Sequence, residues 1–363
     1  MVFDWPFQDF SATPPSVLSV KIIMATTLAS LLTTDAFSDE LRWEQLAPLP
    51  DALGVAAPFA GVSGGVLFVA GGAHFPEKMP WKGGTKKWLD HVWRLDAPDG
   101  VWREAGRLPG ALAYGVSVST ARGVVCAGGS DSARHFAESF RLALRGGALA
   151  VESLPPLPVA LANHCGALLG DTLFVAGGAE KPGEHAASAR VFALDLAVEN
   201  AVWREIESLP GGPRILAAAG SHDGAFYVFG GAALDAKADG KIARTWLRDA
   251  WSYQRGAGWK RLADLPKPLV AAPSPAPFVN GKFLLLAGDD GSLAGFTPVE
   301  KHPGFSRAIL AYDPARDRWS EAGEVPAARA TVPCVAWRGA FIIPSGEVRP
   351  GVRSPEIWSL VPR

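Results

Sequence analysis

The segment Ser345–Trp358, SGEVRPGVRSPEIW, places an acid and an arginine where the two side chains can meet. Glu347 directly follows an apolar run, and Pro350-Gly351 form a turn that can fold Arg353 back toward Glu347. A carboxylate beside a guanidinium suits general acid–base chemistry on a hydroxyl group, with the arginine holding an anionic substrate. We therefore predict Glu347 and Arg353 as catalytic residues. Spacing alone favours the alternative of a loop salt bridge without chemistry.

Further polar residues stand beside apolar runs of the same kind, and we predict them as substrate-binding residues. They are His74, Asn163, His164, Arg214, Asp289 and Arg329. If the runs are strands that end at one face, these side chains gather around a shared mouth suited to a small polar ligand. Structural alternatives remain open: a loop residue for His74, hydrogen bonds for Asn163 and His164, a turn for Asp289 and a salt bridge for Arg329.

A strand-and-turn unit that would position these residues recurs along the chain. Each copy is an apolar run that ends on a glycine pair or its equivalent, and the copies are separated by roughly 50 residues, which is typical of kelch β-propellers. The six runs are expected at Val66–Gly71, Val124–Ala127, Leu173–Ala176, Phe226–Phe229, Phe283–Ala287 and Phe341–Pro344. Tryptophans that recur once per unit, and should pack the blades together, are Trp102, Trp203, Trp259 and Trp319. The sequence therefore predicts an all-β, six-bladed kelch propeller.

The two ends of the repeat region complement each other. The last unit reaches only a third strand, near Glu356–Leu360, whereas a strand around Trp43 has no blade before it. We expect this N-terminal outer strand to complete the last blade and close the ring, which hides two open sheet edges. The predicted domains are a propeller over residues 41–363 and a separate arm over residues 1–40.

Composition narrows the partners and the location. The formal net charge of −1 gives no electrostatic reason to expect nucleic acid. The three cysteines, Cys126, Cys165 and Cys334, have no metal-ligand spacing and are expected to be small buried side chains in apolar strands. A lysine, an apolar run and a small-residue tail before residue 41 resemble a secretory signal peptide, which predicts a periplasmic or secreted protein. The alternative is a disordered arm on a cytoplasmic protein, and the run is too short for stable membrane insertion.

Several segments resemble the N-acetylneuraminate epimerases, or sialic acid mutarotases, which are six-bladed kelch propellers. Ser345–Trp358 is similar to their Gly-Glu-x-x-x-Gly-x-Arg segment, and Gly211–Gly231 to their Gly-Gly-Pro-Arg blade; Leu112–Val118 and Gly54–Pro76 resemble two further blades. The blade order resembles a cyclically permuted branch of the family. The resemblance implies an isomerase of carbohydrate metabolism that acts on a small acidic sugar without metal or cofactor.

The resemblance also implies roles for particular residues. Glu347 matches the proposed proton acceptor, Arg353 its partner arginine, and Arg214 an arginine that faces the same funnel. Leu112 stands where the family has an arginine, so one potential anion contact is absent. The loop Asp289–Ser306 is shorter than its counterpart, which leaves another acidic sugar open as the substrate.

The loop Pro76–Asp90 should form a lid or rim. Its lysines Lys82, Lys86 and Lys87 are expected to be solvated, and Trp81 or Trp88 could stack on a sugar face.

Two other function classes share this fold. One is a non-catalytic kelch propeller that binds a glycan or a protein. The other is a copper radical oxidase, which needs a tyrosine–cysteine crosslink and further tyrosine and histidine ligands. The chain has only four tyrosines, and three of them fall in the predicted second or third strands of their blades, so this second class is disfavoured.

Overall fold

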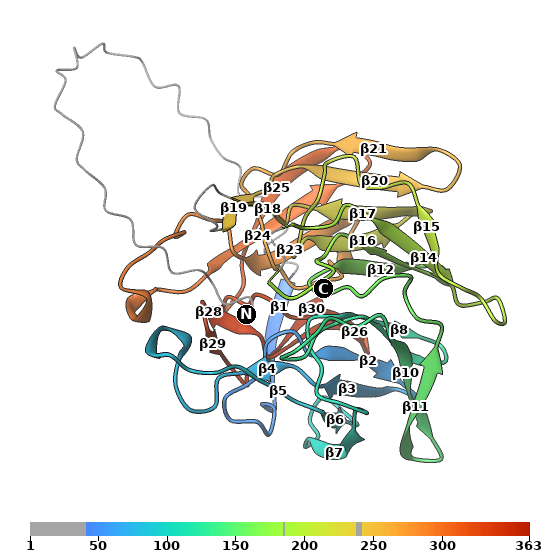
Figure 1. Cartoon of the computed structure of the whole chain (residues 1–363), viewed down its shortest axis with the longest axis vertical. Coiled ribbons are helices and arrows are strands. Elements are labelled where there is room, and N and C mark those ends of the chain that lie inside the picture. Colours follow the sequence, from blue (N-terminus) through green and yellow to red (C-terminus); the bar gives the residue numbers. More distant parts are fainter. Residues whose placement is uncertain (1–40, 184–185, 237–241) are drawn as a thin grey trace, which may run out of the picture.

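The computed structural model of the chain describes residues 41–183, 186–236 and 242–363 (Figure 1). The arm predicted over residues 1–40 lies outside this range. Within it, no helix is long and apolar enough to cross a membrane.

Six four-stranded antiparallel sheets form the predicted β-propeller (Figure 1). Blade one contains β2 (Phe59–Ser63), β3 (Val66–Ala70), β6 (His91–Leu95) and β7 (Arg103–Arg107). Blade two contains β8 (Val116–Thr120), β9 (Gly123–Ala127), β10 (Ser139–Arg145) and β11 (Ala148–Leu154). Blade three contains β12 (Cys165–Leu169), β13 (Thr172–Ala176), β14 (Val191–Asp195) and β15 (Arg204–Ile206).

Blade four contains β16 (Ala218–His222), β17 (Ala225–Phe229), β20 (Ala250–Gln254) and β21 (Gly258–Leu262). Blade five contains β22 (Phe278–Val279), β23 (Lys282–Gly288), β24 (Ser306–Asp313) and β25 (Arg318–Glu324). Blade six contains β26 (Val335–Trp337), β27 (Ala340–Pro344), β30 (Ile357–Pro362) and β1 (Leu41–Leu46). Short 3₁₀ turns lie at Pro80–Lys82 and Val299–Lys301.

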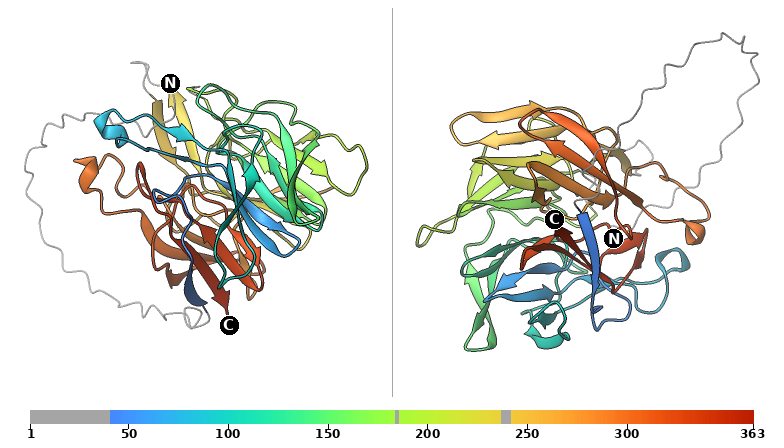
Figure 2. Two further views of the ribbon diagram at one scale, coloured as in Figure 1. Left: turned by 90° about the horizontal axis from the view of Figure 1, so that it is seen from below. Right: turned by 180° about the vertical axis from the view of Figure 1, so that it is seen from behind.

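The predicted ring closure is confirmed. β1 pairs antiparallel with β30, from Leu41 opposite Pro362 to Leu46 opposite Ile357. In Figure 2 the N-terminal strand, in blue, lies against the red C-terminal blade. The first described strand therefore forms the outer edge of the last blade.

The second strand of each blade forms because its residues are apolar on both sides. The sequences VLFVA of β3 and AFYVF of β17 are buried at every position. A strand sandwiched between neighbouring blades has no solvent face, so the polar–apolar alternation of a half-exposed strand is lost. This explains why the predicted runs match the observed strands to within one or two residues.

The recurring tryptophans link neighbouring blades, as expected. Four indole Nε1–H groups donate to backbone carbonyls just beyond the outer strand of the preceding blade. The pairs are Trp102 to Ala47, Trp203 to Pro155, Trp259 to Glu207 and Trp319 to Ala263, at 2.8 to 2.9 Å. Each tryptophan thus fixes the angle between two blades as well as burying an aromatic surface.

A closed ring of six backbone hydrogen bonds surrounds the propeller axis. Each member donates its N–H to the C=O of the member before it, over 2.6 to 3.1 Å, and Ala57 completes the circle by donating to Thr331. The members are Ala57, Tyr114, Asn163, Leu216, Ala271 and Thr331, and all have positive φ, from 49° to 65°. Residues other than glycine and asparagine seldom adopt this backbone conformation, so the surrounding sheets must hold it in place. We call this feature the axial ring.

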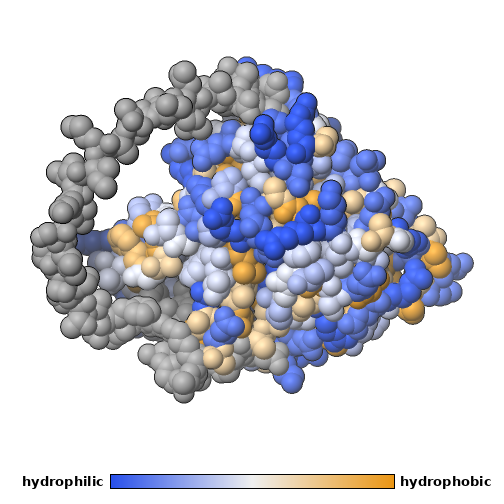
Figure 3. All heavy atoms as spheres, turned by 90° about the horizontal axis from the view of Figure 1, so that it is seen from above, coloured by the Kyte–Doolittle hydropathy of each residue, from blue (hydrophilic) through white to orange (hydrophobic). Residues whose placement is uncertain are grey.

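Three short hairpins that were not predicted from the sequence extend beyond the second strands. They are β4 (Ala73–His74) with β5 (Lys87–Trp88), β18 (Ala232–Ala236) with β19 (Ile242–Trp246), and β28 (Glu347–Arg349) with β29 (Val352–Arg353). Each begins directly after the glycine pair of its blade, so all three rise from the same face of the propeller. The surface shown in Figure 3 is mostly hydrophilic, with only small scattered apolar patches.

Candidate functional site

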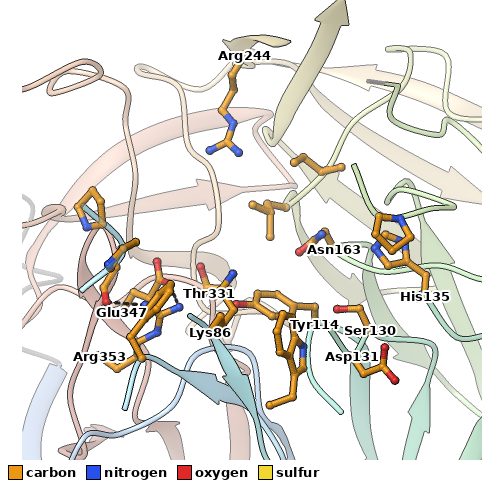
Figure 4. Close-up of a pocket in the computed structure, with 18 residues that line it drawn as sticks. Lys86, Tyr114, Ser130, Asp131, His135, Asn163, Arg244, Thr331, Glu347 and Arg353 are labelled. Atoms are coloured by element: carbon orange, nitrogen blue, oxygen red, sulfur yellow. Dashed lines mark hydrogen bonds and ion pairs between the residues drawn. The ribbon is translucent and has the colours of Figure 1, made fainter. Parts of the chain in front are cut away.

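A pocket lies on the propeller axis, on the face that carries the three hairpins (Figure 4). Tyr114, Asn163, Leu216 and Thr331 of the axial ring form its floor. The walls come from the hairpins and from the segments that follow other second strands. The pocket thus collects residues from several blades that are far apart in the sequence.

Glu347 and Arg353 lie together in this pocket, on the hairpin β28–β29. The two residues are paired across the hairpin, and an ion pair joins Arg353 Nη2 to Glu347 Oε1 over 2.8 Å. Pro350 and Gly351 form the turn, where Gly351 has a φ of 76° that favours glycine. Glu347 is 5% exposed and Arg353 9% exposed. The carboxylate is therefore a nearly dehydrated group at the pocket wall.

The rest of the Arg353 guanidinium contacts the protein. Its Nη1 donates to the carbonyl of Gly351 over 2.6 Å, and its Nε donates to the carbonyl of Ala73 over 3.3 Å. The guanidinium carbon also lies 4.7 Å from the centre of the Phe75 ring, as in a cation–π contact. These contacts hold the guanidinium, and through it the Glu347 carboxylate, in one orientation.

The structure does not bring Arg214 to the pocket. Arg214 is 1% exposed and forms a bidentate ion pair with Asp249, with distances of 2.8 and 2.7 Å. It also donates to the carbonyls of Gly211 and Gly230. A guanidinium saturated in this way supports the blade that contains it.

Arg329 occupies the corresponding place in blade six and also points away from the pocket. Its Nη2 lies 2.6 Å from Glu356 Oε2, and its Nη1 donates to the carbonyl of Ala328. Both Arg214 and Arg329 immediately precede the backbone bridge next to an axial-ring residue. Leu112 has this position in blade two and is buried in the core, so its difference from the family changes packing and not the pocket lining.

Asn163 and His164 differ in their relation to the pocket. Asn163 belongs to the axial ring and lines the pocket. The His164 imidazole does not line it, and its Nε2 contacts the carbonyl of Ala127 over 3.2 Å. Burial lowers the pKa of His164 to about 4, so the imidazole is neutral at pH 7. Asn163 remains a candidate ligand contact, whereas His164 is placed for support.

Asp289 and His74 stand at the margin of the pocket. Asp289 accepts hydrogen bonds from Trp246 Nε1 over 2.6 Å and from the Gly291 N–H over 3.0 Å. Burial raises the pKa of Asp289 above its usual range, against the opposing effect of these hydrogen bonds. His74 Nδ1 lies 3.3 Å from the Asp51 carboxylate. Neither side chain lines the pocket.

Several lining residues were not predicted from the sequence. Arg244, Tyr114, His135 and Thr331 reach the pocket, and so does Lys86, which was expected to be solvated. The Lys86 Nζ lies 5.2 to 5.7 Å from the ring centres of Phe75, Trp88 and Tyr114. Arg244 and Lys86 come from segments inserted within blades, where no repeat indicates their direction. In the part of the chain that the structure describes, no three His, Cys, Asp or Glu side chains cluster closely enough to hold a metal ion.

Sequence comparison places residues 154–295 in a match to the family model for N-acetylneuraminate epimerase. An N-acetylneuraminate epimerase of Haemophilus influenzae (strain PittEE) is 28% identical over 225 residues, which are 56% of this chain and 58% of that protein. One from Yersinia enterocolitica is 29% identical over 234 residues, 57% of each chain. The matched region thus spans a little over half the length of these relatives.

The solved structure of YjhT has a TM-score of 0.64 to this chain at 15% identity, covering 85% of this chain and 94% of that one. This likeness supports the fold. The sequence matches confirm the resemblance indicated by the motifs, in that the chain is similar to the N-acetylneuraminate epimerases. The six sheets show the architecture of a six-bladed propeller.

Proposed function

We propose that this protein is a mutarotase that interconverts the anomers of N-acetylneuraminate or a related acidic sugar. The observation that carries the proposal is the Glu347 carboxylate, buried in the axial pocket and fixed by Arg353 at 2.8 Å. The relatives named N-acetylneuraminate epimerase supply the substrate class.

The reaction in this proposal opens and recloses the sugar ring. Glu347 accepts the proton of the anomeric hydroxyl group, the bond from the anomeric carbon to the ring oxygen breaks, and the ring oxygen takes up a proton from a water molecule. The open-chain carbonyl then rotates and is attacked from its other face, as the same proton transfers run in reverse. A positioned general base contributes about 10²- to 10⁴-fold to such a step.

Arg353 is the positioning partner of Glu347 in this mechanism. Because its guanidinium also contacts the carbonyls of Gly351 and Ala73, it keeps the carboxylate oriented while the proton is transferred. Arg214, which the sequence pattern and the resemblance both assigned to the substrate, has no part in the proposed mechanism, since its guanidinium is bound to Asp249.

The test is NMR exchange between the anomers of N-acetylneuraminate with wild type and with Glu347→Gln. We expect wild type to accelerate the exchange and Glu347→Gln to lose about 10²-fold or more of that acceleration. Glu180→Gln is the matched control, because Glu180 also follows a glycine pair but pairs with Arg190 outside the pocket. Full activity in Glu347→Gln would rule out the assigned base.

The alternative function is a non-catalytic propeller that binds a glycan or a protein. If wild type accelerates no anomer exchange with N-acetylneuraminate or other acidic sugars, this alternative replaces the mutarotase.

We also propose that the protein acts outside the cytoplasm, on the evidence of the signal-like segment before residue 41. Fractionation of cells that express the full chain tests this, and recovery with cytoplasmic markers would contradict it.

A further inference from the structure

We infer that Arg244, on the hairpin β18–β19, binds the carboxylate of the substrate and thereby makes the pocket selective for acidic sugars. The inference rests on the proposed function and gives Arg244 the anion contact that the sequence suggested for Arg353. Figure 4 shows the guanidinium of Arg244 pointing into the pocket from a different wall than Glu347 and Arg353. A ligand in the pocket would thus lie between the base and this cation.

The hairpin β18–β19 aims Arg244 inward. In the hairpin register Arg244 is opposite Leu234 and Trp246 is opposite Ala232. Side chains two residues apart in a strand share a face, so Arg244 and Trp246 project to the same side as the buried Leu234. That side faces the molecule, not the solvent.

Trp246 fixes the base of this hairpin. Its indole Nε1–H donates to Asp289 Oδ2 over 2.6 Å. Its ring also packs so closely on Gly291 that a side chain there would clash with it. The Asp289 carboxylate and the contact with Gly291 together attach the hairpin of blade four to the segment after β23 in blade five. The strand that carries Arg244 is therefore held in a fixed position.

The charges around the pocket favour an anion. Its lining includes the cations Lys86, Arg244 and Arg353 against the carboxylates Glu347 and Asp131, which leaves a positive excess of one. Burial lowers the pKa of Arg244, while the charges of Asp289 and Glu347 oppose that shift. A guanidinium in such a partly dehydrated place gains more from a carboxylate than one in water.

The ion pairs of three other arginines lie within the protein. Arg353 is held by Glu347 and two carbonyl groups, and Arg214 and Arg329 are directed away from the pocket. Arg244 lines the pocket from a different wall than the proposed base. This placement would orient the sugar with its carboxylate toward β19 and its anomeric hydroxyl group toward Glu347.

The experiment compares N-acetylneuraminate with its methyl ester, whose carboxyl group carries no charge, as substrates of wild type and Arg244→Met. We expect Arg244→Met to lower kcat/KM for the acid by about 10- to 100-fold, the range of a charge-assisted hydrogen bond. The value for the ester should change by less than about twofold. Arg244→Lys should retain part of the activity with the acid, because the charge remains and the bidentate geometry is lost.

Arg248→Met is the matched control, since Arg248 lies four residues further along and donates to the carbonyl of Leu265 away from the pocket. An equal loss for acid and ester in Arg244→Met, or no loss for either, would overturn the inference.

A binding measurement separates this inference from the proposed reaction. If wild type binds N-acetylneuraminate in calorimetry but does not accelerate anomer exchange, the mutarotase proposal fails. The inference then stands if Arg244→Met weakens binding of the acid and not of the ester. Absence of any binding to wild type would overturn both.

Discussion

Replacing Asp249 with asparagine tests whether Arg214 is a structural residue or a substrate contact. The substitution keeps the size of the side chain and one acceptor oxygen, but it removes the charge that faces the buried guanidinium. Arg214 is 1% exposed and Asp249 16% exposed, and Trp251 Nε1 also donates to Asp249 Oδ2 over 2.6 Å. The variant therefore leaves a buried arginine without its counter-ion.

Breaking a buried ion pair by removing one partner costs about 3–5 kcal/mol, and we expect the low end, about 3 kcal/mol, because asparagine can still accept one hydrogen bond. For a domain of this size 1 kcal/mol corresponds to about 2 °C, so Tm should fall by about 6 °C. Thermal unfolding followed by circular dichroism at pH 7 measures this. Glu356→Gln, which removes the 43% exposed partner of Arg329, should cost less, about 1 kcal/mol.

The pH dependence gives a second measure of the same pair. Burial acts to raise the pKa of Asp249, but the hydrogen bonds and charge of Arg214 outweigh it and hold the pKa below its ordinary 3.8. A carboxyl group whose folded pKa is depressed stabilises the protein above its unfolded pKa, and the stabilisation is lost as the pH falls toward the folded value. The difference in free energy of unfolding between wild type and Asp249→Asn should therefore be smaller at acid pH than at pH 7.

The outcome that would refute this reasoning is specific. If Asp249→Asn melts with wild type, Arg214 is not held as described. If it melts normally and also raises KM for the sugar, Arg214 acts on the substrate and the placement in the structure is wrong.

Two further predictions concern the core and the ring closure. Burial lowers the pKa of His164 from 6.5 to about 4, so the free energy of unfolding should fall by about 3 kcal/mol as the pH drops from 6.5 toward 4. Thermal melts at several pH values should show a weaker pH dependence for His164→Gln. His91→Gln, at a partly exposed site, is the control. Deleting residues 1–46 should lower the free energy of unfolding by at least about 3 kcal/mol and lower Tm in one cooperative transition, because the apolar contacts of β1 are lost and the edge of β30 is exposed. A deletion of residues 1–40 alone is the control. If the two deletions melt at the same temperature, β1 does not close the ring as described.

The sequence predicted the strands well because each blade repeats one physical solution. An apolar run with both faces buried, a glycine pair and a tryptophan recur at fixed places, so a weak signal in one blade is reinforced by the other five. Glu347 and Arg353 could also be placed, since a two-residue turn leaves a short hairpin few alternatives.

The remaining site residues were harder to place for a physical reason. Arg214 and Arg329 stand at the right backbone position, but a long side chain can turn either toward the axis or into its own blade, and Asp249 and Glu356, far along the chain, decide the direction. Arg244 and Lys86 lie in insertions that no other blade repeats, so neither periodicity nor spacing indicates that they reach the pocket.

The axial ring couples every blade to its two neighbours. Because each of its six residues both donates and accepts around the circle, pulling one blade outward breaks two ring bonds at once and leaves a donor and an acceptor bare on the flanking blades. Opening one blade therefore costs the hydrogen bonds to both neighbouring blades, in addition to the contacts within its own small sheet. The propeller should consequently unfold as one cooperative unit, without the gradual fraying from the ends that open repeat arrays show.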